Sequence, residues 1–245
     1  MSSSPPVAPA RPDKPGADPY AWMRDARDPA LLAYLAAERA YYDQRTAPDA
    51  AVREELTGQM SARVAPAAAS ASWRRGNFVY FTRTVAGLEY EQFCRRRVHG
   101  PAAGEQGPPA EVLLDQNLLL KDPECGGGYV ELGVREVSPD GALLAYSVDF
   151  DGDEVYQLRI RDLASGTDTT TMAGRPERIE RTYYGLAWSA DSRSLFYIVT
   201  NAAYRAYQVW RHDIGTDPAQ DAPVFTEHDE RFEVMVRAPR CVAND

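Results

Sequence analysis

The 245 residues are enough to bury a substantial core, and 44% hydrophobic with 26% charged residues is ordinary for a globular protein. The net charge of −9 argues against a nucleic-acid partner, because neutralising phosphates requires a basic face. No run approaches the roughly 20 apolar residues that span a bilayer, so we expect no membrane partner.

The N-terminal residues and the cysteines bear on the compartment. Residues 1–17 are rich in Ser, Pro and Ala without an apolar period, which predicts a disordered leader rather than a secretory signal. Cys94, Cys125 and Cys241 are odd in number and widely spaced, so they indicate neither a disulfide framework nor a zinc motif. We therefore expect a cytoplasmic protein with no cofactor.

A helical segment is predicted over residues 18–65. Asp28 fits an N-cap and Pro29 the first helical position, and after an interruption at Pro48 a second helix begins with Asp49 as its cap. In the first helix, side chains at helical spacing are expected to form one buried stripe: Leu31, Tyr34, Leu35, Glu38, Tyr41 and Tyr42. The shorter second helix is marked by Val52, Leu56 and Met60.

From Trp73 the pattern changes to that of strands, and residues 66–245 are predicted to form a partial β-propeller. Residues 77–82 and 90–95 are the first strand candidates, and 100–110 form a loop insert rich in Gly, Pro and Ala. Residues 224–225 and 232–236 are expected to begin a further blade.

A repeat runs through residues 138–163 and 189–214 with a constant offset of 51. Each copy begins with the turn sequence Ser-x-Asp-Gly/Ser and continues with strand-forming residues. An earlier, divergent copy places Tyr80 and Tyr90 66 residues before Tyr146 and Tyr156. Strand repeats of roughly this length are typical of propeller blades, so the fold class is mainly β with about three blades.

An alternating acidic run suggests a calcium-binding loop, but its spacing does not fit an EF-hand. Asp149, Asp151 and Asp153 occupy alternate positions, but the places of the required Gly and bidentate Glu of an EF-hand loop hold Glu154 and Ile160. We interpret the run as an acidic hairpin turn.

The histidines and glycines lie outside any recognisable catalytic motif. The histidines are His99, His212 and His228; His212 stands where the first copy of the repeat has Arg161, which indicates a position on a blade. No Gly-x-Ser-x-Gly nucleophile elbow occurs, and the glycines 126–128 lack the Lys of a phosphate-binding loop. We predict no catalytic, cofactor-binding or metal-binding residue in this chain.

Several stretches together resemble a known family. They are residues 18–25, 32–38, 80–83 with Gly87 and Tyr90, 113–117, 137–154 and 187–192. In this combination the chain is similar to the prolyl oligopeptidases, and within them most similar to oligopeptidase B.

This resemblance implies an enzyme in two parts. A seven-bladed propeller would cap an α/β-hydrolase domain that carries the catalytic Ser, Asp and His, and would admit only short peptides. Members similar to oligopeptidase B cleave after Arg and Lys, which implies short basic peptides as substrates. About three of the seven blades are expected here, and the hydrolase domain is absent, so this N-terminal portion is expected to be inactive alone and to have that domain as its partner.

Two other readings remain open. A non-catalytic propeller scaffold for protein–protein binding would need to close its ring to protect its edge strands, which about three blades cannot do. A metal-dependent propeller enzyme would need converging histidines and carboxylates, and the chain has three histidines.

Overall fold

The computed structural model of the chain describes residues 4–11, 18–98, 109–126 and 128–238. The chain divides into two compact units, Met1–Ala65 and Pro66–Asp245. Part of the predicted leader, most of the insert 100–110, His99 and Cys241 lie outside the described residues.

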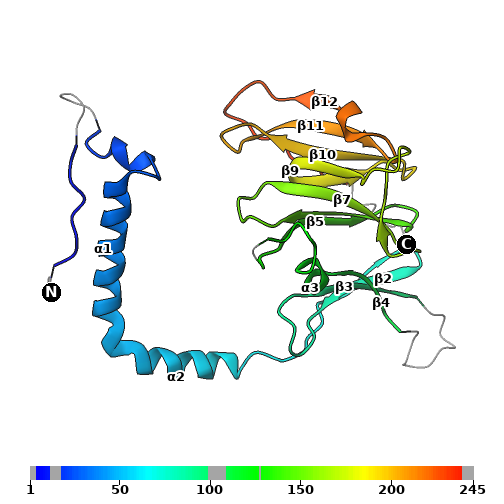
Figure 1. The fold of residues 1–245 in the computed structure, drawn as a ribbon. Coiled ribbons are helices and arrows are strands. Elements are labelled where there is room, and N and C mark those ends of the chain that lie inside the picture. The colour runs from blue at the N-terminus through cyan, green and yellow to red at the C-terminus, as the bar shows by residue number, and fades with distance from the viewer. Residues whose placement is uncertain (1–3, 12–17, 99–108, 127, 239–245) are drawn as a thin grey trace. The chain divides into compact units, whose positions relative to one another are not determined.

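The first unit is helical (Figure 1). It contains a 3₁₀ turn at Ala21–Arg24, helix α1 at Pro29–Thr46, a second 3₁₀ turn at Ala47–Asp49 and helix α2 at Ala50–Ser61. The side chain of Asp28 accepts a hydrogen bond from the Ala30 amide at 2.7 Å, so the predicted cap of α1 is confirmed.

One expectation about these helices is met in part, and another is wrong. Asp49 occupies the N-cap position of α2, but its side chain makes no capping hydrogen bond, because the 3₁₀ turn already leads the backbone into the helix. The predicted apolar stripe is not buried within this unit: Leu31 is the one buried side chain of α1, whereas Leu35 and Tyr42 are 50% and 53% exposed. The two helices meet end to end through the short turn, so neither covers the side chains of the other.

The second unit begins with a four-stranded antiparallel sheet. Its strands lie in sequence order: β1 (Trp73–Arg75), β2 (Phe78–Arg83), β3 (Gln92–Arg97) and β4 (Glu111–Asp115). The short helix α3 (Gln116–Leu119) follows. The strands predicted at 77–82 and 90–95 are present but shifted by one and two residues.

A second, longer sheet contains the repeat. Its strands are β5 (Glu131–Val137), β6 (Leu143–Asp149), β7 (Tyr156–Asp162), β8 (Thr167–Asp168), β9 (Arg178–Trp188), β10 (Ser194–Thr200), β11 (Ala206–Asp213) and β12 (Ala222–Thr226). A 3₁₀ turn at Pro218–Gln220 precedes β12. Both bounds of β10 follow those of β6 by 51 residues, so the sequence repeat corresponds to equivalent strands in neighbouring blades.

Strand β9 belongs to two blades. Its first part pairs with β7, opposing Ile179 to Leu158, and its last part pairs with β10, opposing Leu186 to Tyr197. The positive φ of Gly185, 117°, lies between these parts, where a Cβ atom would come within 2.5 Å of Ile198. Strand β9, which lies between β7 and β10 in Figure 1, is therefore the outer strand of one blade and the inner strand of the next.

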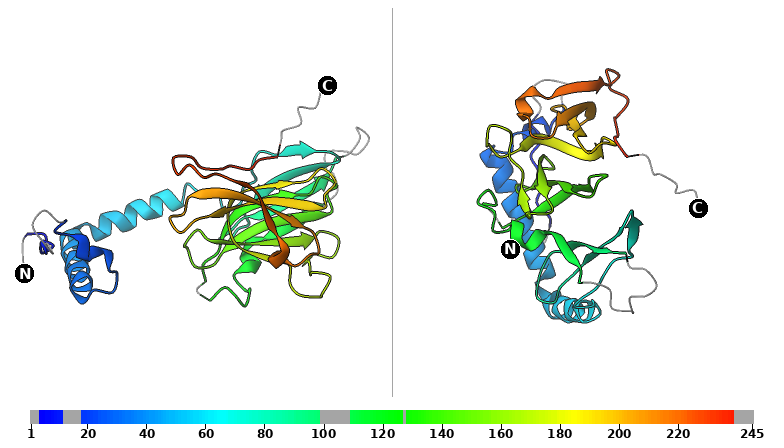
Figure 2. Two further views of the ribbon diagram at one scale, coloured as in Figure 1. Left: turned by 90° about the horizontal axis from the view of Figure 1, so that it is seen from above. Right: turned by 90° about the vertical axis from the view of Figure 1, so that its right-hand side faces the viewer.

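The described residues thus form three four-stranded blades, which fan out as separate layers in the right-hand view of Figure 2. Residues 224–225 lie in β12 and complete the third blade instead of beginning another, because the chain returns to pair with the free edge of β11. Beyond them, Arg237 makes an isolated parallel bridge with Leu186.

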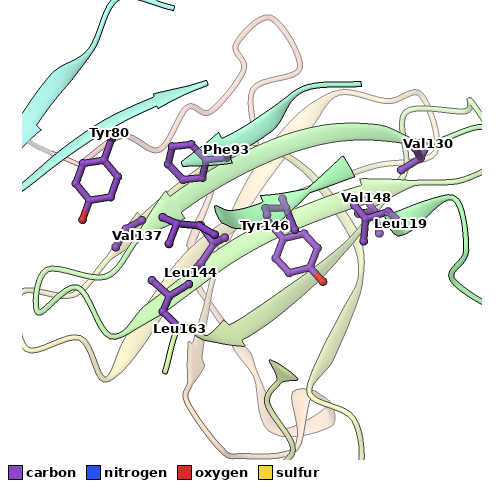
Figure 3. Packing of buried hydrophobic residues seen from close by; sticks show 11 residues of the cluster. Tyr80, Phe93, Leu119, Val130, Val137, Leu144, Tyr146, Val148 and Leu163 are labelled. Carbon is purple, nitrogen blue, oxygen red and sulfur yellow. The ribbon is translucent and has the colours of Figure 1, made fainter. Parts of the chain in front are cut away.

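Apolar side chains fill the spaces between blades. One cluster joins the first blade to the second and includes Tyr80, Phe93, Val137, Leu144 and Tyr146 (Figure 3). Another lies between the second and third blades and includes Leu158, Ile160, Ile179, Leu186 and Leu195. The fold is therefore mainly β, a helical segment followed by a partial propeller, as the sequence predicted.

Candidate functional site

The first strands of the blades form a common wall. In a propeller the innermost strand of each blade faces the central channel, and β1, β5 and the last part of β9 hold this position here. A cavity of about 740 Å³ lies along the wall, lined by residues 133–136, 184–186 and 235–238. The channel side of the blades is therefore hollowed where three successive segments meet.

The backbone of this wall is pressed closely onto β6. A β-bulge between Leu132 and Arg135 turns the Val134 amide toward the Ser147 hydroxyl, which accepts its hydrogen bond at 3.0 Å. A Cβ atom on Gly133 would lie 2.7 Å from the Ser147 Oγ and 2.8 Å from the Tyr156 ring. Only glycine fits there without displacing β6 or β7.

A carboxylate surrounded by tyrosines lies at the start of β5. Tyr129 donates its hydroxyl hydrogen to Glu131 Oε2 at 2.6 Å, and the hydroxyls of Tyr156 and Tyr184 each lie 3.3 Å from Oε1. The two latter hydroxyls are 2.5 Å apart, with ring centroids at 5.1 Å in an edge-on arrangement. Strands β5, β7 and β9 together position this group, which we call the Glu131 cluster.

Two hydroxyls of the Glu131 cluster, those of Tyr129 and Tyr156, remain protonated in neutral solution. The hydrogen bond to Glu131 raises the pKa of Tyr129 to about 12. Burial raises the pKa of Tyr156 well above its usual range, and the bond to Tyr184 adds to the shift. The carboxylate therefore faces hydrogen-bond donors rather than competing anions.

His212 lies in β11 and bridges two carboxylates. Its Nε2 is 2.8 Å from Glu177 Oε1 and its Nδ1 is 2.8 Å from Asp221 Oδ1, with the imidazole fully buried. Burial lowers the pKa of His212, but the bonds to Asp221 and Glu177 outweigh it and raise the pKa to about 9. With both ring nitrogens engaged, His212 has no free position for activating a nucleophile.

The previous copy of the repeat contains the same arrangement with other residues. Arg161, 51 positions before His212, pairs with Asp168 at 3.0 Å, and Tyr146 donates to the same carboxylate at 2.8 Å. In the third blade Tyr197 donates to Asp221 at 2.9 Å. The His212 group thus occupies the position where the second and third blades each link their second and third strands to the segment that follows the third strand.

The acidic run after β6 forms the loop of a hairpin. The Asp149 carboxylate accepts hydrogen bonds from the amides of Asp151 and Gly152 at 2.8 Å and of Glu154 at 2.9 Å. Within the part of the chain that the structure describes, no three His, Cys, Asp or Glu side chains are grouped to hold a metal ion. This carboxylate shapes its own loop.

The other candidates from the sequence are dispersed. His228 is exposed in the turn before residue 232, and Gly126 and Gly128 precede β5 in the loop after α3. Of the helices among the described residues, none is long and apolar enough to cross a bilayer.

Comparison with known proteins gives a consistent set of relatives. The chain matches the family described as "Prolyl oligopeptidase, N-terminal beta-propeller domain" over residues 2–241. It is 34% identical over 236 residues to dipeptidyl aminopeptidase BI of Pseudoxanthomonas mexicana, covering 91% of this chain and 31% of that protein. It is 27% identical over 221 residues to protease 2 of Moraxella lacunata, covering 89% of this chain and 30% of that protein.

Solved structures of oligopeptidase B are similar to this chain. The enzyme from Leishmania major superposes with a TM-score of 0.78 at 26% identity, covering 95% of this chain and 34% of that one. The closed form from Trypanosoma brucei with covalently bound antipain gives a TM-score of 0.74 at 30% identity, with coverages of 92% and 33%. The chain spans about a third of the length of these relatives. It belongs to the prolyl oligopeptidase family and corresponds to the N-terminal β-propeller domain of its peptidases.

Proposed function

We propose that this chain is the substrate-gating propeller portion of a serine-type oligopeptidase that cleaves short peptides after Arg or Lys in the cytoplasm. Residues 18–65 would form its N-terminal helical segment and residues 66–245 its propeller portion, while an α/β-hydrolase domain outside these residues performs the chemistry. The family match over residues 2–241 carries the proposal. The hollowed wall along β5 and β9 supports the gating role, because a passing peptide would contact it.

The electrostatics support a basic substrate. The chain carries a net charge of −9, which favours the approach of cationic peptides. The assignment of catalysis to other residues is supported by His212, whose ring nitrogens both bind carboxylates. Serine peptidases need an imidazole nitrogen within hydrogen-bond reach of the nucleophile.

The test compares the chain alone with a fusion protein that also contains a catalytic domain. The purified chain should not hydrolyse a fluorogenic Arg-Arg peptide, whereas the chain fused in place of the corresponding propeller residues of an oligopeptidase B should. The fusion should cleave a decapeptide containing one Arg and leave reduced, unfolded lysozyme intact. A folded fusion that degrades the long chain as fast as the decapeptide would contradict the gating role. Serine-reagent-sensitive turnover by the chain alone would contradict the division of labour.

A further inference from the structure

We infer that the Glu131 cluster is a subsite for the cationic side chain of a basic peptide, with the Glu131 carboxylate as its charge partner. The inference rests on the proposed function and deepens it, because it names a group on the propeller that would recognise the substrate. Three observations carry it: the hydrogen-bonding capacity left on the carboxylate, the absence of a compensating cation among the described residues, and the open space beside it.

A count of hydrogens shows that the carboxylate is not saturated. Four contacts join Glu131 and the hydroxyls of Tyr129, Tyr156 and Tyr184, but these hydroxyls supply three hydrogens. One of them is used between Tyr156 and Tyr184, so the carboxylate receives two. A carboxylate offers about four lone-pair positions, which leaves room for two N–H donors of a guanidinium or ammonium group.

The negative charge of Glu131 has no cation beside it in the part of the chain that the structure describes. Two other part-buried carboxylates of the blades do have one: Asp122 lies 2.5 Å from Arg159, and Asp168 lies 3.0 Å from Arg161. The nearby Arg135 is directed elsewhere, 4.0 Å from a Glu91 oxygen and 5.3 Å from the centre of the Phe93 ring. A partly buried carboxylate held by neutral hydroxyls attracts a cation more strongly than an exposed one, because water screens it less.

Space and aromatic faces are available next to the carboxylate. Glu131 lines a cavity of about 320 Å³ together with Gln116 and residues 132–135, and residues 133–135 also line the larger cavity that includes Tyr184. Tyr129 and Tyr184 are 40% and 39% exposed, so ring surface is open to a ligand. A cation over a tyrosine face gains further attraction from the ring.

The cluster lies at the end of the inner strands where the chain enters the propeller. Trp73, Arg135 and Leu186 oppose Tyr80, Tyr146 and Tyr197, which the repeat makes equivalent. Glu131 and Tyr184 lie before Arg135 and Leu186 in the chain, as residues 69–72 lie before Trp73. The cluster is therefore at the N-terminal end of the inner strands. A peptide entering the channel from this end would meet the cluster first.

The rival explanation is that the tyrosines and Glu131 only hold β5, β7 and β9 together. Binding separates the two readings. The chain, immobilised at low density so that copies cannot associate, is titrated with acetyl-Ala-Arg-Ala-amide and with the same peptide carrying citrulline, which has the shape of arginine without its charge. We expect the arginine peptide to bind about fivefold more tightly at low salt, and this preference to disappear at high salt. Equal affinities for the two peptides would overturn the inference.

Variants locate the effect. Glu131→Gln should abolish the arginine preference, while Glu55→Gln, which removes one negative charge from an exposed position in α2, should retain it. Tyr184→Phe keeps the ring and removes a hydroxyl, so it should retain most of the preference. A full preference in a folded Glu131→Gln chain would place the recognition elsewhere. No peptidase activity enters these measurements, so their failure is distinguishable from failure of the fused enzyme.

Discussion

At the scale of single residues, two buried basic side chains of the blades, Arg159 and His212, are paired with carboxylates. Arg159 is 2% exposed and lies 2.5 Å from Asp122 and 3.1 Å from Glu124. His212 is held between Glu177 and Asp221 in the same way. A buried ion without its partner costs several kcal/mol, so these groups fix the arrangement of strands more than they add net stability.

The His212 group should make stability depend on pH. Its pKa is about 9 when folded against 6.5 unperturbed, so its contribution is complete below pH 6.5 and is lost as the pH rises to about 9. We expect the free energy of unfolding to fall by up to roughly 3 kcal/mol over this interval, measured by urea denaturation. His212→Gln should flatten the dependence, and His228→Gln, at an exposed position, should not. Stability that rises over the interval would contradict the assignment.

The close contact at Gly133 predicts a stability loss from one added methyl group. Gly133→Ala would place its Cβ within 2.8 Å of Ser147 and Tyr156, so we expect a loss of about 2 kcal/mol or more by thermal denaturation. Gly58→Ala is the matched control, because nothing lies within 4 Å of its added carbon and alanine favours a helix. Equal effects of the two substitutions would contradict the described packing of β5.

At the scale of elements, the Ser-x-Asp turns form the same hydrogen bonds in both copies. Ser138 bonds to Asp140 at 2.5 Å and accepts from the Leu143 amide at 2.9 Å. Ser189 bonds to Asp191 at 2.6 Å and accepts from the Ser194 amide at 2.9 Å. The bonds to the serine hydroxyls lower the pKa of both aspartates. The turn sequence thus fixes the hairpin between the first two strands of a blade.

Equivalent turns should nevertheless differ in their cost of mutation. Ser138 is 1% exposed, whereas Ser189 is partly open to water, which can replace lost hydrogen bonds. We expect Ser138→Ala to lower the free energy of unfolding by about 2 kcal/mol and Ser189→Ala by less than about 1 kcal/mol. Chemical denaturation of the pair provides its own control, and a larger loss for Ser189→Ala would contradict the difference in burial.

Local patterns predicted the elements well, while the Glu131 cluster was not foreseen. The offset of 51 identified β6 and β10 as equivalent strands, because a repeat preserves strand positions. Asp28 and Pro29 marked the start of α1 through their local chemistry. In contrast, Tyr129, Tyr156 and Tyr184 do not share a period, and they come together through the pairing of β6 with β5 and β7 and of β7 with β9. Burial of the α1 stripe was mispredicted because amphipathic spacing does not identify what covers a helix.

At the scale of the whole molecule, the third blade has an uncovered apolar surface. Val224, Phe225, Phe232 and Met235 are each more than half exposed. The Arg205 guanidinium donates to the backbone carbonyls of Glu227, Asp229 and Phe232, and so holds this segment beside β11. Apolar surface of this kind favours association with another surface.

We therefore expect the purified 245-residue chain to self-associate. Light scattering after size exclusion should give a mass above that of the 27.2 kDa monomer, increasing with concentration. Phe225→Ser with Val224→Thr should shift the chain toward monomer because it removes apolar area from β12. Leu88→Ser, at another exposed apolar position, serves as the control. A monodisperse monomer at all concentrations would contradict this expectation.

The double membership of β9 has a consequence for how such a chain can be lengthened or shortened by gene duplication. An insertion or deletion that began and ended at the borders of a blade would divide β9 and leave one blade without an edge strand. A segment of 51 residues that begins within residues 138–163 avoids this, because each of these residues has a counterpart 51 positions later. The unit that can be duplicated in this propeller is therefore a fixed length of chain rather than a blade.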